Sequence, residues 1–383
     1  MNSKILRTIN IHLYLLDNKV LIVYGPRQVG KTTIIKDFLE SYKGKYKSYT
    51  GDSTTIQEIF SSQRLEKLKE YVEGLDLLFI DEAQNIKNIG INLKMTVDNF
   101  PGIKVIVTGS SSFELAGQIG EPLMGRNIII NLYPISDGEL RGSVYFEPST
   151  YMDYTLRFGS YPEVITEQTV ENKVLKVKSL MESFLLKDIL KFENLKKPDI
   201  LLSLLKLLAY QIGNEVNINE LAKELKVNYR TIDRYIEILE QAFVIYRLRS
   251  YSNNLRNEIK KKSKIYFYDL GIRNAIIDDF SDTNIIKGNL YRKDLGSMFE
   301  NYLIMERLKN NSYNKRYLQT FFWRNTAGKE VDYIEKVNND FNVYEFTLNN
   351  KTKKKYPKIL EESLSANKFS FDIITLDNYR EFI

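Results

Sequence analysis

The residues best suited to chemistry form one stretch, Gly25 to Thr32, with the sequence GPRQVGKT. Glycines at both ends let the backbone wrap a polyphosphate closely, so that its N–H groups point at negative charge. Lys31 can reach the β- and γ-phosphates, and the Thr32 hydroxyl can hold Mg²⁺. A strand pattern precedes this stretch and a helical pattern follows it to about Tyr42, which favours a phosphate-binding loop over a structural turn. The residues expected to bind the nucleotide are Gly25, Pro26, Arg27, Gln28, Val29, Gly30, Lys31, Thr32 and Thr33.

An acid pair follows the next strongly apolar segment. Residues 75–80 are predicted to form a buried parallel strand, which ends in Asp81 and Glu82. Asp81 would hold Mg²⁺ together with Thr32, and Glu82 would polarise a water for in-line attack on the γ-phosphate. Paired acids at a strand end are, by themselves, equally well explained as helix caps. Beside a phosphate loop, they favour a Mg-ATP site.

Two further polar residues stand where the following strands begin or end. Residues 103–108 form another β-branched apolar run, and Ser110 follows it, so its hydroxyl could orient the attacking water. The next two serines are as well explained as caps of a helix that begins at Phe113. Arg126 directly precedes a predicted strand at 127–132. It could stabilise transition-state charge in its own or a neighbouring subunit, or be an ordinary ion-pairing arginine.

Four segments occur in a fixed order along the chain: GPRQVGKTT, LLFIDEAQ, VTGSSSFEL, and a Gly-Arg pair followed by NLYPIS. In these segments the chain resembles AAA+ family ATPases of prokaryotes, the group in which such a domain precedes a C-terminal region of uncharacterised function. The resemblance runs through most of the chain. For Arg126 it leaves open whether the residue acts within one subunit or across a homo-oligomer interface. The resemblance implies a nucleotide and Mg²⁺ site made by Lys31, Thr32, Asp81, Glu82 and Ser110.

Composition limits the other kinds of site. The chain of 383 residues has no cysteine and one histidine, His12, which excludes disulfides, thiolate zinc sites and imidazole clusters. Any metal must therefore have oxygen ligands. The longest apolar run, Leu201 to Leu208, is broken by Lys206, and no apolar leader opens the chain. We therefore expect a soluble cytoplasmic protein that makes no use of a membrane.

The middle of the chain is predicted to be helical and then to form a winged helix. Helical periodicity runs from residue 151 to 208, and the break FGSYPE within it resembles the turn into the family's helical lid. A capped helix at 216–225, a turn, a second helix at 230–241 and strands at 243–248 and 265–268 follow. This succession predicts a winged-helix module whose second helix could enter a groove of DNA.

Charge is concentrated in this module. The window from 223 to 264 holds eleven basic and five acidic residues, an excess of +6 that equals the net charge of the whole chain. Basic residues on the second helix and in the wing suit phosphate contacts, although many winged helices bind only proteins and a lysine run is often only a solvated loop. The candidate nucleic-acid contacts are Arg230, Arg234, Lys260, Lys261 and Lys262.

The C-terminal region contains three acids that could converge. Glu300 shares a helix face with apolar residues, and Asp332 and Glu345 lie on alternating strands. Such a cluster resembles the PD-(D/E)XK nuclease fold, in which acids hold Mg²⁺ and a lysine two residues after the last acid assists the attacking water. Thr347 stands in the place of that lysine. Lys329 or Lys351 could substitute, and the three acids could also be unrelated residues of a small α/β domain.

The predicted fold is α/β, with a P-loop AAA+ core and parallel sheet at 1–138, a helical lid at 139–208, a winged helix at 209–285 and a nuclease-like domain at 286–383. The predicted function is an ATPase that binds and hydrolyses Mg-ATP and acts on DNA, with a degenerate nuclease-like domain. One alternative is an ATP-dependent switch that binds a protein partner with negligible turnover. Another is an active, ATP-gated nuclease.

Overall fold

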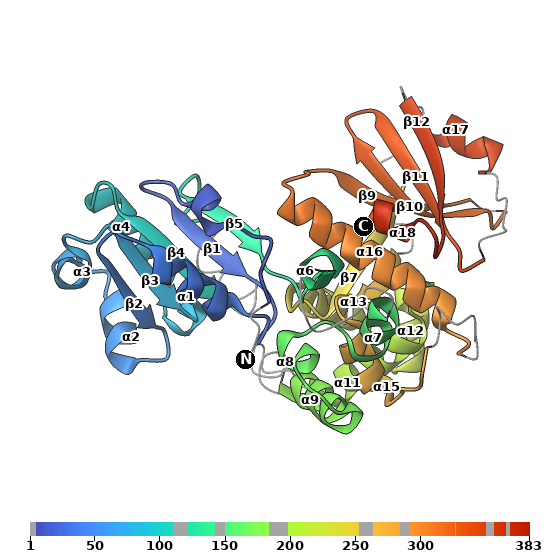
Figure 1. The fold of residues 1–383 in the computed structure, drawn as a ribbon, viewed down its shortest axis with the longest axis horizontal. Coiled ribbons are helices and arrows are strands. Elements are labelled where there is room, and N and C mark those ends of the chain that lie inside the picture. The colour runs from blue at the N-terminus through green and yellow to red at the C-terminus, as the bar shows by residue number, and fades with distance from the viewer. Residues whose placement is uncertain are drawn as a thin grey trace.

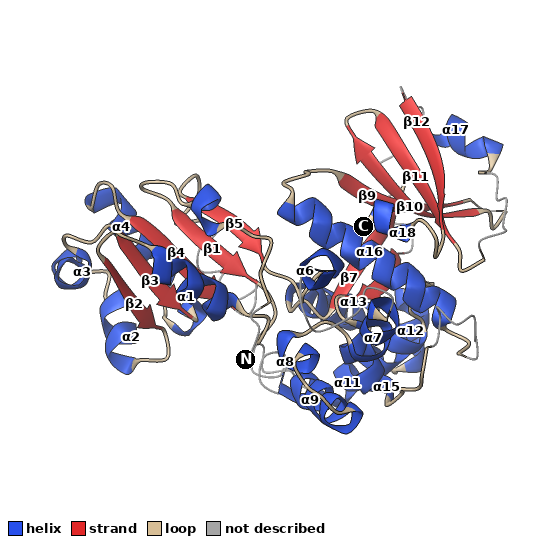
Figure 2. Cartoon of the chain, viewed as in Figure 1, coloured by secondary structure: helices blue, strands red, loops and turns tan. Residues whose placement is uncertain are grey.

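The computed structural model describes residues 5–109, 121–141, 150–183, 198–252, 263–283, 292–325, 327–349, 356–364 and 368–383. Two sheets lie at opposite ends of the molecule, with a group of helices beside the second (Figures 1 and 2). No helix within these ranges has the length and apolar character needed to cross a membrane.

The first sheet has the strand order β2-β3-β4-β1-β5, and every neighbouring pair is parallel. Its apolar central strands fall where the sequence predicts them. Because the strands are parallel, the residues that follow β1, β3 and β4 meet at one edge. The strands are β1 (Val20–Tyr24), β2 (Tyr46–Thr50), β3 (Leu77–Asp81), β4 (Lys104–Gly109) and β5 (Asn127–Asn131).

Helices cover both faces of this sheet. Alternate strand residues such as Leu21 and Phe79 pack with α1 (Lys31–Ser41), whereas Ile22 and Ile80 belong to the cluster on the other face. That second face is covered by three helices, and short 3-10 turns precede β1 and follow β3. The second-face helices and the turns are α2 (Thr54–Phe60), α3 (Leu65–Val72), α4 (Ile89–Asn99), η1 (Ile11–Tyr14) and η2 (Ala83–Asn85).

The predicted lid is helical, but it is not a separate layer. Helix α15 (Leu270–Ile277), from the segment predicted to belong to the winged helix, packs against α7, α9 and α11. The Asp269 carboxylate at the start of α15 accepts a 2.7 Å hydrogen bond from the Ser160 backbone N–H. The other helices of this group are α6 (Asp137–Arg141), α7 (Tyr151–Phe158), α8 (Pro162–Ile165), α9 (Val170–Ser183) and α11 (Pro198–Tyr210).

The second sheet is mixed and has the strand order β12-β11-β10-β9-β7-β8-β6. Strand β7, from the predicted wing, pairs in parallel with β9 of the predicted nuclease-like domain. One sheet therefore contains strands from both sides of the predicted domain boundary at residue 285. The strands are β6 (Glu215–Val216), β7 (Ile245–Ser250), β8 (Ser263–Phe267), β9 (Gln319–Arg324), β10 (Glu330–Val337), β11 (Asp340–Phe346) and β12 (Lys368–Ile374).

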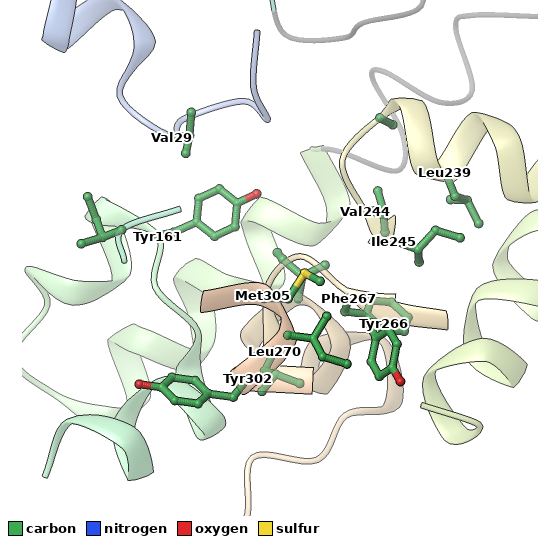
Figure 3. Close-up of a cluster of buried hydrophobic side chains, with 14 of the residues drawn as sticks. Val29, Tyr161, Leu239, Val244, Ile245, Tyr266, Phe267, Leu270, Tyr302 and Met305 are labelled. Carbon is green, nitrogen blue, oxygen red and sulfur yellow. The ribbon is translucent and has the colours of Figure 1, made fainter. Parts of the chain in front are cut away.

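Helix α16 (Leu295–Tyr313) runs between the second sheet and the helical group, and Glu300, which the sequence places on a helix, lies within it. Figure 3 shows buried side chains from several parts of the chain in one cluster, including Val29, Tyr161, Tyr302 and Met305. The parts of the chain are therefore packed on a common core. The remaining helices are α12 (Ile218–Glu224), α13 (Tyr229–Gln241), α17 (Lys358–Leu364) and α18 (Tyr379–Phe382).

Candidate nucleotide site and carboxylate cluster

The phosphate-binding loop lies between the end of β1 and the start of α1, as predicted from its sequence. Gly25 is required by close packing, because a Cβ atom there would lie 2.1 Å from the Leu132 carbonyl oxygen. Gly30 has φ +98°, in the left-handed region that favours glycine. The buried Lys31 ammonium donates to the carbonyl oxygens of Gly25 and Pro26, at 3.0 and 2.8 Å. The lysine therefore lies across its own loop.

The structure brings Thr32 and Asp81 together. The Thr32 hydroxyl donates to the Asp81 carboxylate, with oxygen–oxygen distances of 2.8 and 3.1 Å. A hydroxyl and a carboxylate oxygen are suitable ligands for Mg²⁺, so this pair fits the metal that accompanies a nucleotide. The approach follows from topology, since both residues stand at the carboxyl edge of the parallel sheet.

Thr108 is a polar contact that the sequence reasoning missed. Its hydroxyl, near the end of β4, donates to the Asp81 carboxylate and accepts a 3.0 Å hydrogen bond from the Glu82 backbone N–H. Thr108 is fully buried, so this hydroxyl is a fixed part of the site. The signal was present, because Thr108 is the hydroxyl-bearing residue that closes an apolar strand run next to the acid pair.

Glu82 has a specific backbone and side-chain arrangement. Its φ of +49° lies in the left-handed region, and a Cβ on Gly51 would lie 2.3 Å from its carbonyl oxygen. The Glu82 carboxylate accepts a hydrogen bond from the side-chain amide of Gln84. Gln84 was also not foreseen, although it stands in the same IDEAQ segment as the acids.

Arg126 lies at the opposite edge of the sheet from the loop. Its carbonyl accepts from the Val20 N–H at 2.8 Å, at the beginning of β1, whereas the loop follows the end of β1. Four residue steps of strand separate the two ends, which is about 13 Å. Its guanidinium pairs with Asp98 at 2.6 Å. The prediction that it reaches a phosphate in its own subunit is therefore wrong, and only the version across a subunit interface stays a hypothesis.

The two arginines proposed as nucleic-acid contacts lie on α13 and are exposed. Ile232, Ile236 and Leu239 on the same helix are buried, as its amphipathic pattern predicts. The Arg230 Nε donates to the Tyr229 hydroxyl at 3.4 Å. The predicted residues Ser110, Lys260, Lys261 and Lys262 lie outside the described residues, as does the candidate Lys351.

The predicted carboxylate cluster forms in part, and a lysine stands at its centre. The Lys264 ammonium, 2% exposed on β8, lies 2.9 Å from a Glu300 oxygen and 3.8 Å from an Asp332 oxygen. Glu330 approaches the same ammonium at 2.5 Å, and the Tyr266 hydroxyl donates to Glu300 at 2.6 Å. Sequence reasoning missed Lys264 because it belongs to a strand far away in the chain.

Glu345, the third predicted acid, lies on strand β11. It lines a cavity of about 530 Å³ with Glu330, Lys329, Tyr356 and Lys358. Within the part of the chain that the structure describes, no group of three or more acidic or histidine side chains is arranged to hold a metal ion. The ammonium of Lys264 lies among these acids, where the nuclease resemblance implies Mg²⁺.

The charges in the cluster shift one another's protonation. Burial raises the pKa of Glu300 to about 7, because the repulsion from Asp332 adds to burial and Lys264 offsets only part of it. Burial alone would lower the pKa of Lys264, but Glu300, Asp332 and Glu330 raise it. Lys264 is therefore a permanent cation near neutral pH, while Glu300 changes its charge there.

Three family models match consecutive segments of the chain. Residues 17–141 match the AAA domain, residues 149–283 match a domain of unknown function (DUF8612), and residues 295–381 match another domain of unknown function (DUF4143). The predicted resemblance to AAA+ ATPases of prokaryotes is thus confirmed for an AAA-type domain followed by DUF4143. The matches assign neither a winged helix nor a nuclease.

Relatives along most of the chain are themselves uncharacterized. One, from Methanocaldococcus jannaschii, is 23% identical and covers 96% of this chain and 85% of the relative. Another, from Haemophilus influenzae, is 22% identical and covers 67% and 69%, respectively. A solved STAND protein with a tetratricopeptide repeat sensor, from Pyrococcus horikoshii, matches with a TM-score of 0.28 and 14% identity, over 78% of this chain. The chain spans about half of that protein, 46%.

These observations define the first part of the chain. The AAA match and the parallel sheet with its phosphate loop give an α/β, P-loop ATPase-like domain, to which a second, mixed sheet is joined.

The shifted pKa of Glu300 predicts a pH dependence of stability. An unfolded glutamate ionises near pH 4.5, whereas folded Glu300 keeps its proton to about pH 7. Between these values the folded state binds more protons, so the free energy of unfolding should fall as pH rises, by up to about 1 kcal/mol per pH unit. Glu300→Gln should flatten this dependence in urea titrations at pH 5, 6 and 7. The exposed Glu237→Gln should keep it, and equal slopes in both variants would contradict the assignment.

Proposed function

We propose that this chain binds and hydrolyses Mg-ATP and acts on DNA through α13, and that its C-terminal carboxylate cluster does not cut nucleic acid. The observation that carries the ATPase proposal is the contact between Thr32 and Asp81. It joins the phosphate loop directly to the acid pair, as a shared Mg²⁺ would require. The match to the AAA domain supports the same reading.

Each residue of the site has a defined task in this proposal. When bound with ATP, Mg²⁺ supplies positive charge to the phosphates, and Thr32 and Asp81 would be its protein ligands. Lys31 would exchange its bonds to the loop carbonyls for phosphate oxygens. Thr108 orients Asp81 and the Glu82 backbone, and Glu82 would accept a proton from the attacking water.

A switch with slow turnover is the second candidate, and the Gln84 contact favours it. The amide of Gln84 donates to the Glu82 carboxylate, which therefore has to leave this partner or share it before it can position water. A neighbouring subunit could raise the rate by supplying Arg126, which would first have to leave Asp98. Slow basal hydrolysis and acceleration by assembly are then expected together.

Action on DNA is supported by the order and pairing of elements in the middle of the chain. Helix α11, strand β6, helices α12 and α13, and strands β7 and β8 follow one another, with β8 between β6 and β7 in antiparallel pairing. This is the arrangement expected of a winged helix. Helix α13 presents Arg230 and Arg234 to solvent, where they could reach phosphates. Protein binding by the same helix is the alternative.

Loss of cleavage in the C-terminal region is supported by Lys264. Its ammonium occupies the position where three carboxylates converge, so a divalent cation would have to displace a buried, paired charge. An ammonium also cannot polarise a phosphoryl oxygen as a Lewis acid does. Together with Thr347 in place of the expected lysine, this favours a retained fold without nuclease chemistry.

ATP turnover tests the first part of the proposal. Phosphate release should be abolished in Lys31→Ala, and Glu82→Gln should bind ATP but hydrolyse it about 10² to 10⁴ times more slowly. Glu70→Gln, on the exposed face of α3, should behave as the parent chain. Measurements with double-stranded DNA, single-stranded DNA and RNA identify the stimulating partner. Parental turnover in Lys31→Ala would contradict the role of the loop in catalysis. Parental turnover in Glu82→Gln would contradict the assignment of Glu82 as the base.

Binding measured at several salt concentrations tests the DNA interface. Arg230→Glu combined with Arg234→Glu should weaken double-stranded DNA binding and lower the slope of log affinity against log salt by about 2. The matched variant reverses the charges of Lys67 and Lys69 by changing both to Glu. These lysines are exposed on α3 at the other end of the molecule (Figure 1). This variant should leave the slope unchanged. A parental slope in the α13 variant would exclude α13 from the interface.

Incubation of supercoiled DNA with the full chain and Mg²⁺ or Mn²⁺ tests the carboxylate cluster. No nicking is expected, because Lys264 supplies the cation at that site. Cutting that is lost in Asp332→Ala but kept in Asp340→Ala, on the neighbouring strand β11, would establish an active nuclease instead.

A further inference from the structure

Arg7 is buried beneath the phosphate loop and joins four segments of the chain. Its guanidinium donates to the carbonyl oxygens of Val29, in the loop, and Tyr133, after β5, at 2.9 and 2.7 Å. It also pairs with Glu139 of α6 at 3.1 Å and donates to the Tyr313 hydroxyl at 3.2 Å. Its side chain is 9% exposed, so these partners replace water. Of these partners, only Val29 belongs to the nucleotide site described above.

The bond to Val29 determines where a loop amide points. The Val29 carbonyl and the Gly30 N–H belong to one trans peptide plane and point in opposite directions. Arg7 holds the carbonyl side of this plane, and its Nη1 atom would lie 3.8 Å from a Cβ placed on Gly30. The Gly30 N–H is therefore turned away from Arg7, as a loop that binds phosphate through its amides needs.

Glu139 and Tyr313 both hold Arg7 in place. The Glu139 carboxylate, whose side chain has no exposed surface, also accepts from the Thr8 and Ser136 backbone N–H groups, at 2.8 and 2.9 Å. The Tyr313 hydroxyl accepts from the Tyr133 backbone N–H at 3.1 Å as well as from Arg7. The Tyr313 hydroxyl therefore connects the last residue of α16 to Arg7, which holds the phosphate loop.

Helix α16 is fixed by polar contacts along its length. The Glu306 carboxylate accepts from the Asp137 backbone N–H at 2.6 Å, and Lys309 donates to the Ile135 carbonyl at 3.2 Å. Near its other end, Glu300 belongs to the Lys264 cluster. The 19 residues of the helix span about 28 Å. Helix α16 thus runs from the Lys264 cluster to Arg7, which holds the phosphate loop.

We propose that Arg7 is a positioning residue for the phosphate loop and that Tyr313 makes this positioning depend on α16, so that the C-terminal region tunes the affinity for nucleotide. This inference rests on the proposed binding of ATP at the loop. Coupling of this kind is reciprocal: if α16 placement changes nucleotide affinity, nucleotide binding changes α16 to the same extent. A partner that binds the C-terminal region would then be coupled to the nucleotide without touching it.

Tyr313→Phe tests the proposal, because it keeps the ring and removes only the oxygen that accepts from Arg7 and from Tyr133. The Kd of a fluorescent ATP analogue should rise about tenfold, as loss of a hydrogen bond to a charged group implies. The turnover rate at saturating ATP should change little, because Tyr313 does not touch the acid pair. ATP-dependent hydrogen-exchange protection of α16 should be present in the parent chain and weakened in the variant.

Tyr317→Phe is the matched control, since Tyr317 follows the same helix and is 90% exposed. It should leave the Kd and the exchange pattern unchanged. A parental Kd in Tyr313→Phe, or an equal rise in both variants, would overturn the role of Tyr313. Arg7→Lys, which keeps the charge but loses the forked contacts, should raise the Kd at least as much, and a parental Kd there would overturn the role of Arg7. If the parent chain binds no ATP, the proposed function fails instead.

Discussion

The structure depends on a constraint set by helix α16, which carries ionisable side chains into the interior. A buried charge is costly unless another group pairs with it, and the partners here come from distant parts of the chain. Glu300 meets Lys264 of β8, Glu306 meets the backbone of α6, and Arg307 meets Glu335 of β10. Apolar packing alone is non-directional, whereas these contacts require particular atoms to face one another. They therefore fix how the helix lies against the second sheet and the helical group.

The same constraint reaches the nucleotide loop. Arg7 is buried, so its charge needs Glu139, and its other donors need acceptors, which the loop, the segment after β5 and α16 supply. The first sheet could form from its own apolar strands. The placement of its phosphate loop against the remainder of the chain depends instead on a few buried polar contacts. This is why residues remote from the acid pair are expected to affect nucleotide binding.

What could be predicted from the sequence follows from how local each signal is. The loop at Gly25 to Thr32 and the approach of Thr32 to Asp81 follow from strand patterns and from the rule that parallel strands end at one edge. The same rule argues against action of Arg126 within its own subunit, since a residue before a strand lies at the opposite edge. Lys264 and Tyr313 could not be found, because their partners lie 36 and 306 residues away in the chain. The pairing of β7 with β9 has no local signal either, because either strand pattern would suit a separate small sheet.

The carboxylates of the two sites have different kinds of partner. At Asp81 the neighbours are the hydroxyls of Thr32 and Thr108, which are neutral donors, and under the proposed function this carboxylate would be a ligand for Mg²⁺. At Glu300 the neighbour is Lys264, a cation that belongs to the chain and is held by three acids at once. Under the proposed function, the first arrangement would change as the nucleotide is bound and released. The second cation is part of the chain itself, and its contacts tie β8, α16 and β10 together.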